Sequence, residues 1–207
     1  FTSVKMRLFS LNRTLKLNAD QKDDFDVISA EIRHIDTIVQ NFLEFSRPPK
    51  LVMQSVSPSS VVDNALSLLT HRLKSFEVKV KLVRSQNLPN VSADPEQLKE
   101  VLVNLLINAC EALGKGGSVT VREEVNQDLD LGTVAQIRIS DDGPGIPAAI
   151  IGRVMEPFFT TKAEGTGLGL SIAARIIDEH GGRIDVTSVE CQETAFTIKL
   201  PVIGGAC

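Results

Sequence analysis

Apolar residues recur at alternating spacings of three and four along the first 46 positions, and this rhythm constrains the fold more than any other feature. The first run consists of Phe1, Val4, Leu8, Leu11 and Leu15. The second run consists of Phe25, Ile28, Ile32, Ile35, Val39 and Phe42. Because such spacing aligns side chains in one stripe of an α-helix, it predicts two helices, over residues 1–17 and about 20–46. A polar break at 18–20 separates the helices and two prolines at 48–49 end the second, so they are expected to form an antiparallel hairpin.

A two-helix hairpin leaves further apolar side chains without cover. They are Phe9, Ile38, Leu43 and Phe45. A second copy of the hairpin would bury them in a four-helix bundle. We therefore expect a homodimer that forms through this segment.

The pattern changes to mixed α and β after a linker at residues 50–57, so we expect one domain over 1–49 and a second over 58–207. Predicted helices of the second domain are 58–72, 94–113 and about 166–180, and its predicted strands are 78–82, 118–123, 133–140, 183–188 and 194–200. A long irregular stretch, 141–165, separates two of the strands. This order predicts an α+β protein: the helical hairpin, followed by an α/β sandwich whose mixed sheet is covered by helices on one face.

Composition excludes several functions. Lys and Arg number 22 against 26 Asp and Glu, a formal net charge of −4, which argues against a nucleic-acid partner bound through phosphates. The three cysteines lack zinc-site spacing and form an odd set, which indicates a reducing compartment. No run approaches the roughly 18 apolar residues of a membrane helix. We expect this chain in the cytoplasm without a membrane span of its own, even if a longer parent protein is anchored to the inner membrane.

Two asparagines lie four residues apart in an otherwise apolar predicted helix, VLVNLLINA (101–109). Asn104 and Asn108 therefore project from one face. One asparagine alone is most often a tolerated surface residue, but two in an apolar helix need polar partners. Their amide oxygens suit magnesium, which takes one or two ligands from the protein and arrives with phosphates. The pair is a candidate site for a metal-bound nucleotide.

Two later loops have features of a nucleotide site. In SDDGPGIP (140–147), Asp141 follows a predicted strand and could accept a hydrogen bond from an exocyclic amine, while the glycines allow close approach. GTGLGL (165–170) opens a predicted helix, whose backbone N–H groups could cradle phosphates. Before it, EPFFTTK (156–162) offers two phenylalanines to pin a lid and a lysine that could reach a phosphate. Each segment alone is also explained as an ordinary turn, a flexible loop or a core aromatic pair with a solvated lysine.

Taken in this order, the segments resemble the catalytic and ATP-binding domain of bacterial sensor histidine kinases, part of the gyrase, heat-shock chaperone, histidine kinase and mismatch-repair ATPase superfamily. NLLINA (104–109) resembles the N box, DDGPG (141–145) the first glycine box, EPFF (156–159) the F box and GTGLGL (165–170) the second glycine box. The hairpin and FLEFSRP (42–48) resemble the dimerisation and phosphotransfer domain of nitrogen-regulation-type kinases. The resemblance implies an enzyme that binds Mg-ATP, transfers the γ-phosphoryl group to a histidine and serves an aspartate on a response-regulator receiver domain.

The resemblance also implies roles for individual residues. Asn108 and Asn104 would hold magnesium, Asp141 would read the adenine amine, and Asn108 and Lys162 would act in catalysis. Residues 160–164 would form the lid. The implied nucleotide-binding set is Asn104, Asn108, Asp141, Gly143, Gly145, Ile146, Phe158, Thr160, Thr161, Lys162, Gly165, Thr166, Gly167, Leu168, Gly169 and Leu170.

The chain departs from the family pattern in three places. The phosphorylated histidine, with its following acidic residue and proline, is not found, and the resemblance implies a fragment that starts just past it. His34 faces away from the apolar stripe and is expected to be solvated, whereas His180 is expected to cap the end of its helix. Asn104 replaces the water-activating glutamate of hydrolytic relatives, and an amide cannot take a proton at neutral pH. The turn at 189–194 lacks the usual glycine, and its two glutamates suggest support by side chains.

Two alternatives to a kinase stay open. A degenerate module that binds ATP without phosphotransfer would explain the missing histidine, whereas the intact nucleotide boxes favour the kinase. A serine kinase or a chaperone-like ATPase of the same superfamily is disfavoured by the helical hairpin and by Asn104.

Overall fold

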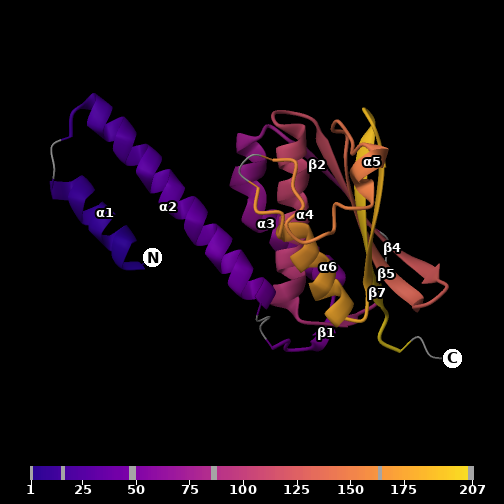
Figure 1. Cartoon of the computed structure of the whole chain (residues 1–207). Coiled ribbons are helices and arrows are strands. Elements are labelled where there is room, and N and C mark those ends of the chain that lie inside the picture. The colour runs from indigo at the N-terminus through magenta and orange to yellow at the C-terminus, as the bar shows by residue number, and fades with distance from the viewer. Residues whose placement is uncertain (1, 15–16, 47–49, 85–87, 163–164, 205–207) are drawn as a thin grey trace.

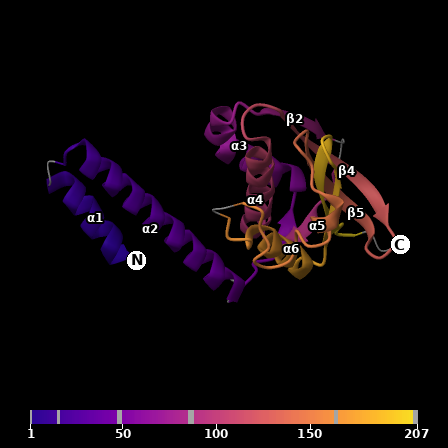
Figure 2. The ribbon, with the colours of Figure 1, turned by 45° about the horizontal axis from the view of Figure 1, so that its top comes forward.

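The two N-terminal helices lie side by side. A computed structural model describes residues 2–14, 17–46, 50–84, 88–162 and 165–204. Both views show α1 (Thr2–Thr14) and α2 (Ala19–Ser46) running antiparallel (Figures 1 and 2). Asn18 Oδ1 accepts from the Gln21 N–H at 2.8 Å and Gln21 Oε1 accepts from the Asn18 N–H at 3.2 Å, a reciprocal cap that starts α2. Within the described ranges, no helix is both long and apolar enough to cross a bilayer.

A five-stranded mixed sheet and its helices form the rest of the molecule. The strands are β2 (Lys79–Arg84), β4 (Ser118–Asp128), β5 (Gly132–Asp141), β6 (Arg183–Val189) and β7 (Glu193–Pro201). Their spatial order is β2-β4-β5-β7-β6, with β2 and β4 parallel and the other neighbours antiparallel. The helices α3 (Pro58–Ser75), α4 (Pro95–Leu113) and α6 (Gly169–Glu179) cover one face of the sheet (Figures 1 and 2). The predicted fold class is confirmed.

Alternation along the strands and an apolar stripe on α4 build the core. Alternate residues in the first half of β4 and the second half of β5 belong to the core under the helices, including Val119, Val121, Ile137 and Ile139. The buried stripe of α4 consists of Leu98, Val101, Leu102, Leu105, Leu106 and Ala109. Asp94 caps this helix by accepting from the N–H groups of Glu96 and Gln97 at 3.0 and 3.2 Å. The helix ends at Gly114, whose φ is 69°, so the bounds predicted from the sequence are confirmed.

His180 ties the end of α6 to the start of α4. Its Nε2 accepts from the Asp94 N–H at 2.9 Å, and its Nδ1 lies 2.6 Å from the Ile176 carbonyl oxygen. An accepting Nε2 leaves the proton on Nδ1, which then donates to Ile176. The predicted capping role is confirmed, and the bond to Asp94 is an addition that the sequence did not indicate. The Val52 N–H donates to the Asp94 carboxylate at 2.8 Å, so residue 52 of the predicted linker is also bound to the start of α4.

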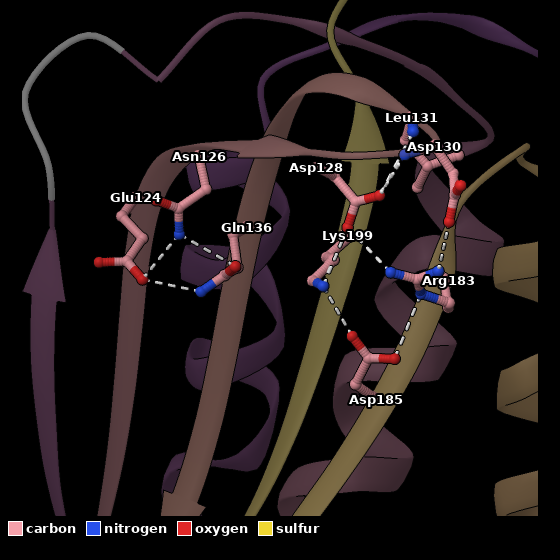
Figure 3. A network of polar contacts seen from close by, with 9 residues as sticks. All are labelled: Glu124, Asn126, Asp128, Asp130, Leu131, Gln136, Arg183, Asp185 and Lys199. Carbon is pink, nitrogen blue, oxygen red and sulfur yellow. Dashed lines mark hydrogen bonds and ion pairs between the residues drawn. The ribbon is translucent and has the colours of Figure 1, made fainter.

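The sheet face away from the helices carries a network of ion pairs (Figure 3). Asp128, at the end of β4, accepts from Lys199 at 3.0 Å and from Arg183 at 2.9 Å. Asp185 pairs with the same two cations, at 2.8 Å to Lys199 and 3.2 Å to Arg183. The Lys199 hydrogen bond leads the interactions that lower the pKa of Asp128 to about 2. Every charged group in this cluster is matched by an opposite charge.

Three short features escaped the sequence analysis. Within the predicted linker, β1 (Gln54–Val56) pairs antiparallel with β3 (Val91–Ala93), so residues 54–56 belong to the packed domain. The stretch predicted to be irregular contains a single helical turn, α5 (Ala148–Ile151). The helix predicted to start near residue 166 starts at Gly169, because the preceding residues form the loop described below.

Candidate functional site

The two asparagines of α4 lie together on one half-buried face, as predicted. Asn104 Nδ2 donates to the Gly169 carbonyl oxygen at 2.5 Å, and Asn108 Nδ2 lies 3.5 Å from Asn104 Oδ1. A Cβ on Gly169 would come within 2.8 Å of Asn104 Oδ1, so a larger residue there would push the asparagine side chain from this position. The first turn of α6 therefore rests directly on the asparagine pair.

Lys162 reaches the same face from the segment between α5 and α6. Its Nζ lies 3.3 Å from Asn108 Oδ1 and 2.6 Å from Glu111 Oε2. The other oxygen of Glu111 pairs with Arg72 of α3 at 3.3 Å. These contacts form a row of polar groups across α4, in which a lysine ammonium already sits beside the amide oxygen of Asn108.

Asp141 ends β5 with one carboxylate oxygen available. The residue is 4% exposed, and its Oδ1 accepts from the Gly143 N–H at 3.1 Å. Among the described residues, nothing donates to Oδ2, and this atom is not sealed from solvent. Burial raises the pKa of Asp141 to about 6, helped by the nearby charges of Asp142 and Glu193. A partly buried acceptor of this kind can recognise an exocyclic amine.

Asp142 stabilises the turn after β5, as expected for an ordinary Asp-Gly turn. Its Oδ1 accepts from the Ser118 N–H at 2.7 Å, which joins the end of β5 to the start of β4. A Cβ at Gly143 would lie 3.6 Å from Leu113 Cδ2, so the loop lies beside the last turn of α4. Asp141 and the asparagine face thus belong to the same half of this helix.

The rest of the first glycine loop packs on the β6–β7 turn. Gly145 has a φ of 76°, and a Cβ there would lie 2.6 Å from the Val189 carbonyl oxygen. Pro144 accepts from the Cys191 N–H and Ser188 Oγ accepts from the Ile146 N–H, both at 2.8 Å. One backbone contact and one contact to a serine hydroxyl therefore hold this turn against the loop. Of the two glutamates predicted to support the turn, Glu193 forms a 2.7 Å pair with Arg138 on β5.

The second glycine loop is packed equally closely. Gly167 has a φ of 67°, and a Cβ there would collide with the backbone of Phe158. A Cβ on Gly165 would collide with Thr160 Oγ1, which also accepts from the Lys162 N–H at 3.1 Å. The F box and the glycine loop thus form one unit whose backbones touch, next to Asn104 and Asn108.

The side chains of several predicted site residues pack within the fold or have contacts inside the loop. Leu168 is buried in the core, and the side chains of Ile146 and Leu170 pack against it. Of the two phenylalanines, Phe159 lies 4.6 Å from the Arg153 guanidinium, whereas the ring of Phe158 is 59% exposed. Thr161 and Thr166 lie in the loop, where Thr166 Oγ1 accepts from the Leu168 N–H at 3.3 Å.

Sequence reasoning missed Glu111, Arg72 and Ser188. Glu111 was detectable, because three residues after Asn108 it falls on the same helix face. The contacts of Arg72 and Ser188 join segments far apart in the chain, and no local pattern signals them. Cys110 is buried next to this face, as predicted, and burial raises the pKa of its thiol, which keeps it protonated and unreactive.

The donor set fits a metal ion that arrives with its own ligands. Among the residues described, no group of three or more His, Cys, Asp or Glu side chains could hold a metal alone. The two amide oxygens of Asn104 and Asn108 are neutral, hard donors on one face. Magnesium needs only one or two such protein ligands when phosphates and water supply the others. The residues therefore suit a magnesium-nucleotide complex.

Comparisons with known proteins agree with this geometry. Residues 93–203 match the family model described as histidine kinase-, DNA gyrase B- and HSP90-like ATPase. The chain is 35% identical over 176 residues to the sensor histidine kinase ZraS of Escherichia coli (strain K12), covering 85% of this chain and 37% of ZraS. It is 35% identical over 179 residues to sporulation kinase E of Bacillus subtilis (strain 168), covering 86% of this chain and 24% of that kinase. The chain thus spans well under half the length of these relatives.

Solved structures share the fold. The catalytic domain of histidine kinase ThkA aligns with a TM-score of 0.63 at 31% identity, covering 72% of this chain and 97% of that domain. ThkA in complex with the response regulator TrrA aligns with a TM-score of 0.73 at 26% identity, covering 97% of this chain and 57% of that one. Since the family model spans more than half of the chain and the relatives are sensor kinases, the chain belongs to the histidine kinase-, DNA gyrase B- and HSP90-like ATPase family, among the bacterial sensor histidine kinases.

Proposed function

We propose that this chain is the dimerisation and catalytic part of a sensor kinase that binds Mg-ATP and transfers the γ-phosphoryl group to a histidine. The phosphoryl group would then pass to an aspartate of a response-regulator receiver domain. One observation carries the proposal: Asn104, Asn108 and Lys162 meet on one face of α4, near an aspartate that has a free, partly buried oxygen. The solved complex of the related kinase ThkA with a response regulator supports the proposed partner.

Each residue has a role that its contacts support. Asp141 Oδ2 would accept from the adenine amine, while the turn at 189–194 holds the loop that shapes the pocket. Asn104 and Asn108 would orient the phosphates and the metal, which when bound offsets phosphate charge. Lys162 would exchange its contact with Glu111 for a phosphate oxygen. These residues bind and position the nucleotide, which supplies most of the rate in phosphoryl transfer.

The chemistry of Asn104 favours a protein nucleophile over water. Its amide donates to the Gly169 carbonyl and cannot act as a base at neutral pH. Of the histidines in the printed sequence, His180 has both ring nitrogens engaged, and His71 is exposed on α3. The side chain of His34 lies outside the described residues. We propose that the acceptor is a histidine of the full-length protein.

The experiment separates binding from transfer. Incubating the full-length protein with ATP labelled at the γ-phosphate should give acid-labile label on the protein, while Asn108→Ala should weaken Mg-ATP binding by about tenfold or more, the loss expected when a charge-assisted contact is removed. Asn126→Ala provides the matched control, because this asparagine lies on the opposite face of the sheet. Binding without labelling would favour the degenerate ATP-binding module, and no binding would rule out both functions.

A further inference from the structure

Glu111 places a negative charge beside the proposed phosphate site. Residues 104, 108 and 111 are spaced by four and three, so Glu111 continues the asparagine face by one turn. Its Oε2 lies 2.6 Å from Lys162 Nζ, and the same ammonium lies 3.3 Å from Asn108 Oδ1. Glu111 therefore holds the cation that the proposed function assigns to a phosphate.

This arrangement makes Glu111 a competitor of the polyphosphate. Lys162 is a single ammonium on a flexible stem and cannot neutralise two anionic partners fully. When Lys162 turns to a phosphate, Glu111 still pairs with Arg72, whose guanidinium lies 3.3 Å from Glu111 Oε1. The Arg72 side chain is about half exposed to solvent. A partly screened carboxylate then remains close to the bound anion.

The repulsion between the Glu111 carboxylate and the bound nucleotide depends on the charge of the nucleotide. A fully ionised nucleoside triphosphate carries about four negative charges, and a bound divalent cation offsets two of them. Coulomb repulsion scales with the product of the charges, so the metal-free form is repelled about twice as strongly as the chelated form. The side chains of Glu111 and Lys162 are 34% and 44% exposed, so solvent weakens this repulsion without removing it.

We propose that Glu111 is a specificity-determining residue that makes the site prefer a metal-chelated polyphosphate over the free one. The inference rests on the proposed function, because it presumes that the site binds a nucleotide. The opposite role makes a different prediction: if Glu111 positioned Lys162 for the phosphate, its removal would weaken binding of both forms. The two roles predict opposite signs for the change in affinity.

The test measures the Kd of ATP with excess magnesium and with a chelator, for the wild type, Glu111→Gln and Glu111→Asp. In Glu111→Gln the ratio of the metal-free to the magnesium Kd should fall about fivefold to tenfold, mainly because metal-free ATP binds more tightly. Glu111→Asp keeps the charge and should keep most of the preference. Glu96→Gln is the matched control, since this glutamate of the same helix pairs with Lys99 in the first turn, and its ratio should equal that of the wild type.

Each result decides the inference. An unchanged ratio in Glu111→Gln, or weaker binding of both forms, would overturn the role of Glu111 and leave the proposed function standing. A wild type that binds ATP in neither condition would overturn the proposed function and this inference with it. Raising the salt concentration should shrink the effect of Glu111→Gln, because exposed charges are screened.

Discussion

Asp141 combines a binding role with a cost to stability. Burial raises its pKa to about 6, so at neutral pH the folded protein holds a carboxylate that would be more stable in water. In the unfolded chain the pKa returns to about 3.9. The penalty is therefore absent when both states are protonated, below about pH 4, and is complete above about pH 6.

Replacing Asp141 with Asn should stabilise the protein while it weakens recognition of adenine. We expect the free energy of unfolding at pH 8 to rise by about 1 kcal/mol, discounted for the contact of Oδ2 with solvent, and the gain to vanish below about pH 4. The preference for ATP over GTP should fall, because an amide presents one acceptor and one donor. Chemical denaturation at several pH values and nucleotide competition measure the two effects. Asp178→Asn, an exposed change on α6, should alter neither.

The same carboxylate predicts how binding depends on pH. If the ionised form is the acceptor for the adenine amine, affinity should fall about tenfold between pH 7 and pH 5, since about nine tenths of Asp141 is protonated at pH 5. ATP also gains a proton in this range. The variant Asp141→Asn serves as the control for that proton. It binds the same nucleotide but lacks the carboxylate, so its pH profile shows the effect of ATP protonation alone. A wild-type profile parallel to that of Asp141→Asn would remove Asp141 from the adenine site.

At the residue scale, the sequence reveals chemistry better than backbone conformation. Asn108 and Asp141 were singled out as candidates by their residue types and positions, and the structure places the first beside Asn104 and the second at the end of β5. Cys191 was noted only as part of a turn without glycine, yet its φ is 60°, a left-handed conformation that glycine adopts at lower cost. The strain follows from the packing of this turn against Pro144, which joins segments more than 40 residues apart.

Among the elements, α6 spans the first half of α4, from its N-cap to Asn104. Its first residue, Gly169, lies on Asn104, and the residue after its last turn, His180, bonds to the N-cap residue of α4. Since the ends of α6 meet α4 in reverse order, the two helices run antiparallel. The glycine loop that precedes α6 is therefore held to α4 at two places, beside Asn104 and, through His180, at the start of α4.

Removing the His180 side chain should destabilise the protein by about 2–3 kcal/mol. The substitution His180→Ala leaves the buried Asp94 N–H without its acceptor and opens a small cavity. Equilibrium unfolding in urea measures the loss. His71→Ala is the matched control, because that histidine is exposed on α3 and should change the stability by less than about 0.5 kcal/mol. Equal effects of the two substitutions would contradict a structural role for the His180 bonds.

Element prediction succeeds where a pattern is long and fails where it is short. The strands β4, β5 and β7 and the capped helix α4 were all detectable from their sequence patterns. The three-residue strands β1 and β3 are too short to show a period and form only because the chain brings them together. The start of α6 was placed too early, because glycines that favour a helix N-terminus here serve the close packing of Gly167 on Phe158.

At the scale of the whole molecule, the candidate site and the ion-pair network lie at opposite ends of the sheet. Val119 pairs with Asp141 at one end of the β4–β5 ladder, and Asp128 pairs with Gly132 at the other. Nine residues of strand place the ion-pair network of Asp128 roughly 30 Å from the candidate site. Substitutions in that network test stability without touching the nucleotide.

The helical hairpin has apolar side chains that a single chain does not bury. Apolar side chains of α1 and α2 remain exposed, among them Met6, Phe9, Ile28, Ile35 and Leu43. Burying these side chains against a second hairpin would form the four-helix bundle proposed from the sequence. We therefore expect a mass in solution of twice the 22.5 kDa of one chain.

Ile28→Asp should convert this dimer into monomers, because Ile28 is 50% exposed in one chain and a carboxylate in its place would be buried in the bundle without a partner. Leu68→Asp is the matched control, since Leu68 is 65% exposed on α3, outside the hairpin, and should leave the dimer intact. Sedimentation equilibrium measures both masses. A dimer that survives Ile28→Asp, or dissociates with Leu68→Asp, would place the interface elsewhere. Because Asn104, Asp141 and Lys162 lie outside the hairpin of α1 and α2, the monomer should bind ATP as tightly as the dimer, and only phosphoryl transfer should depend on pairing.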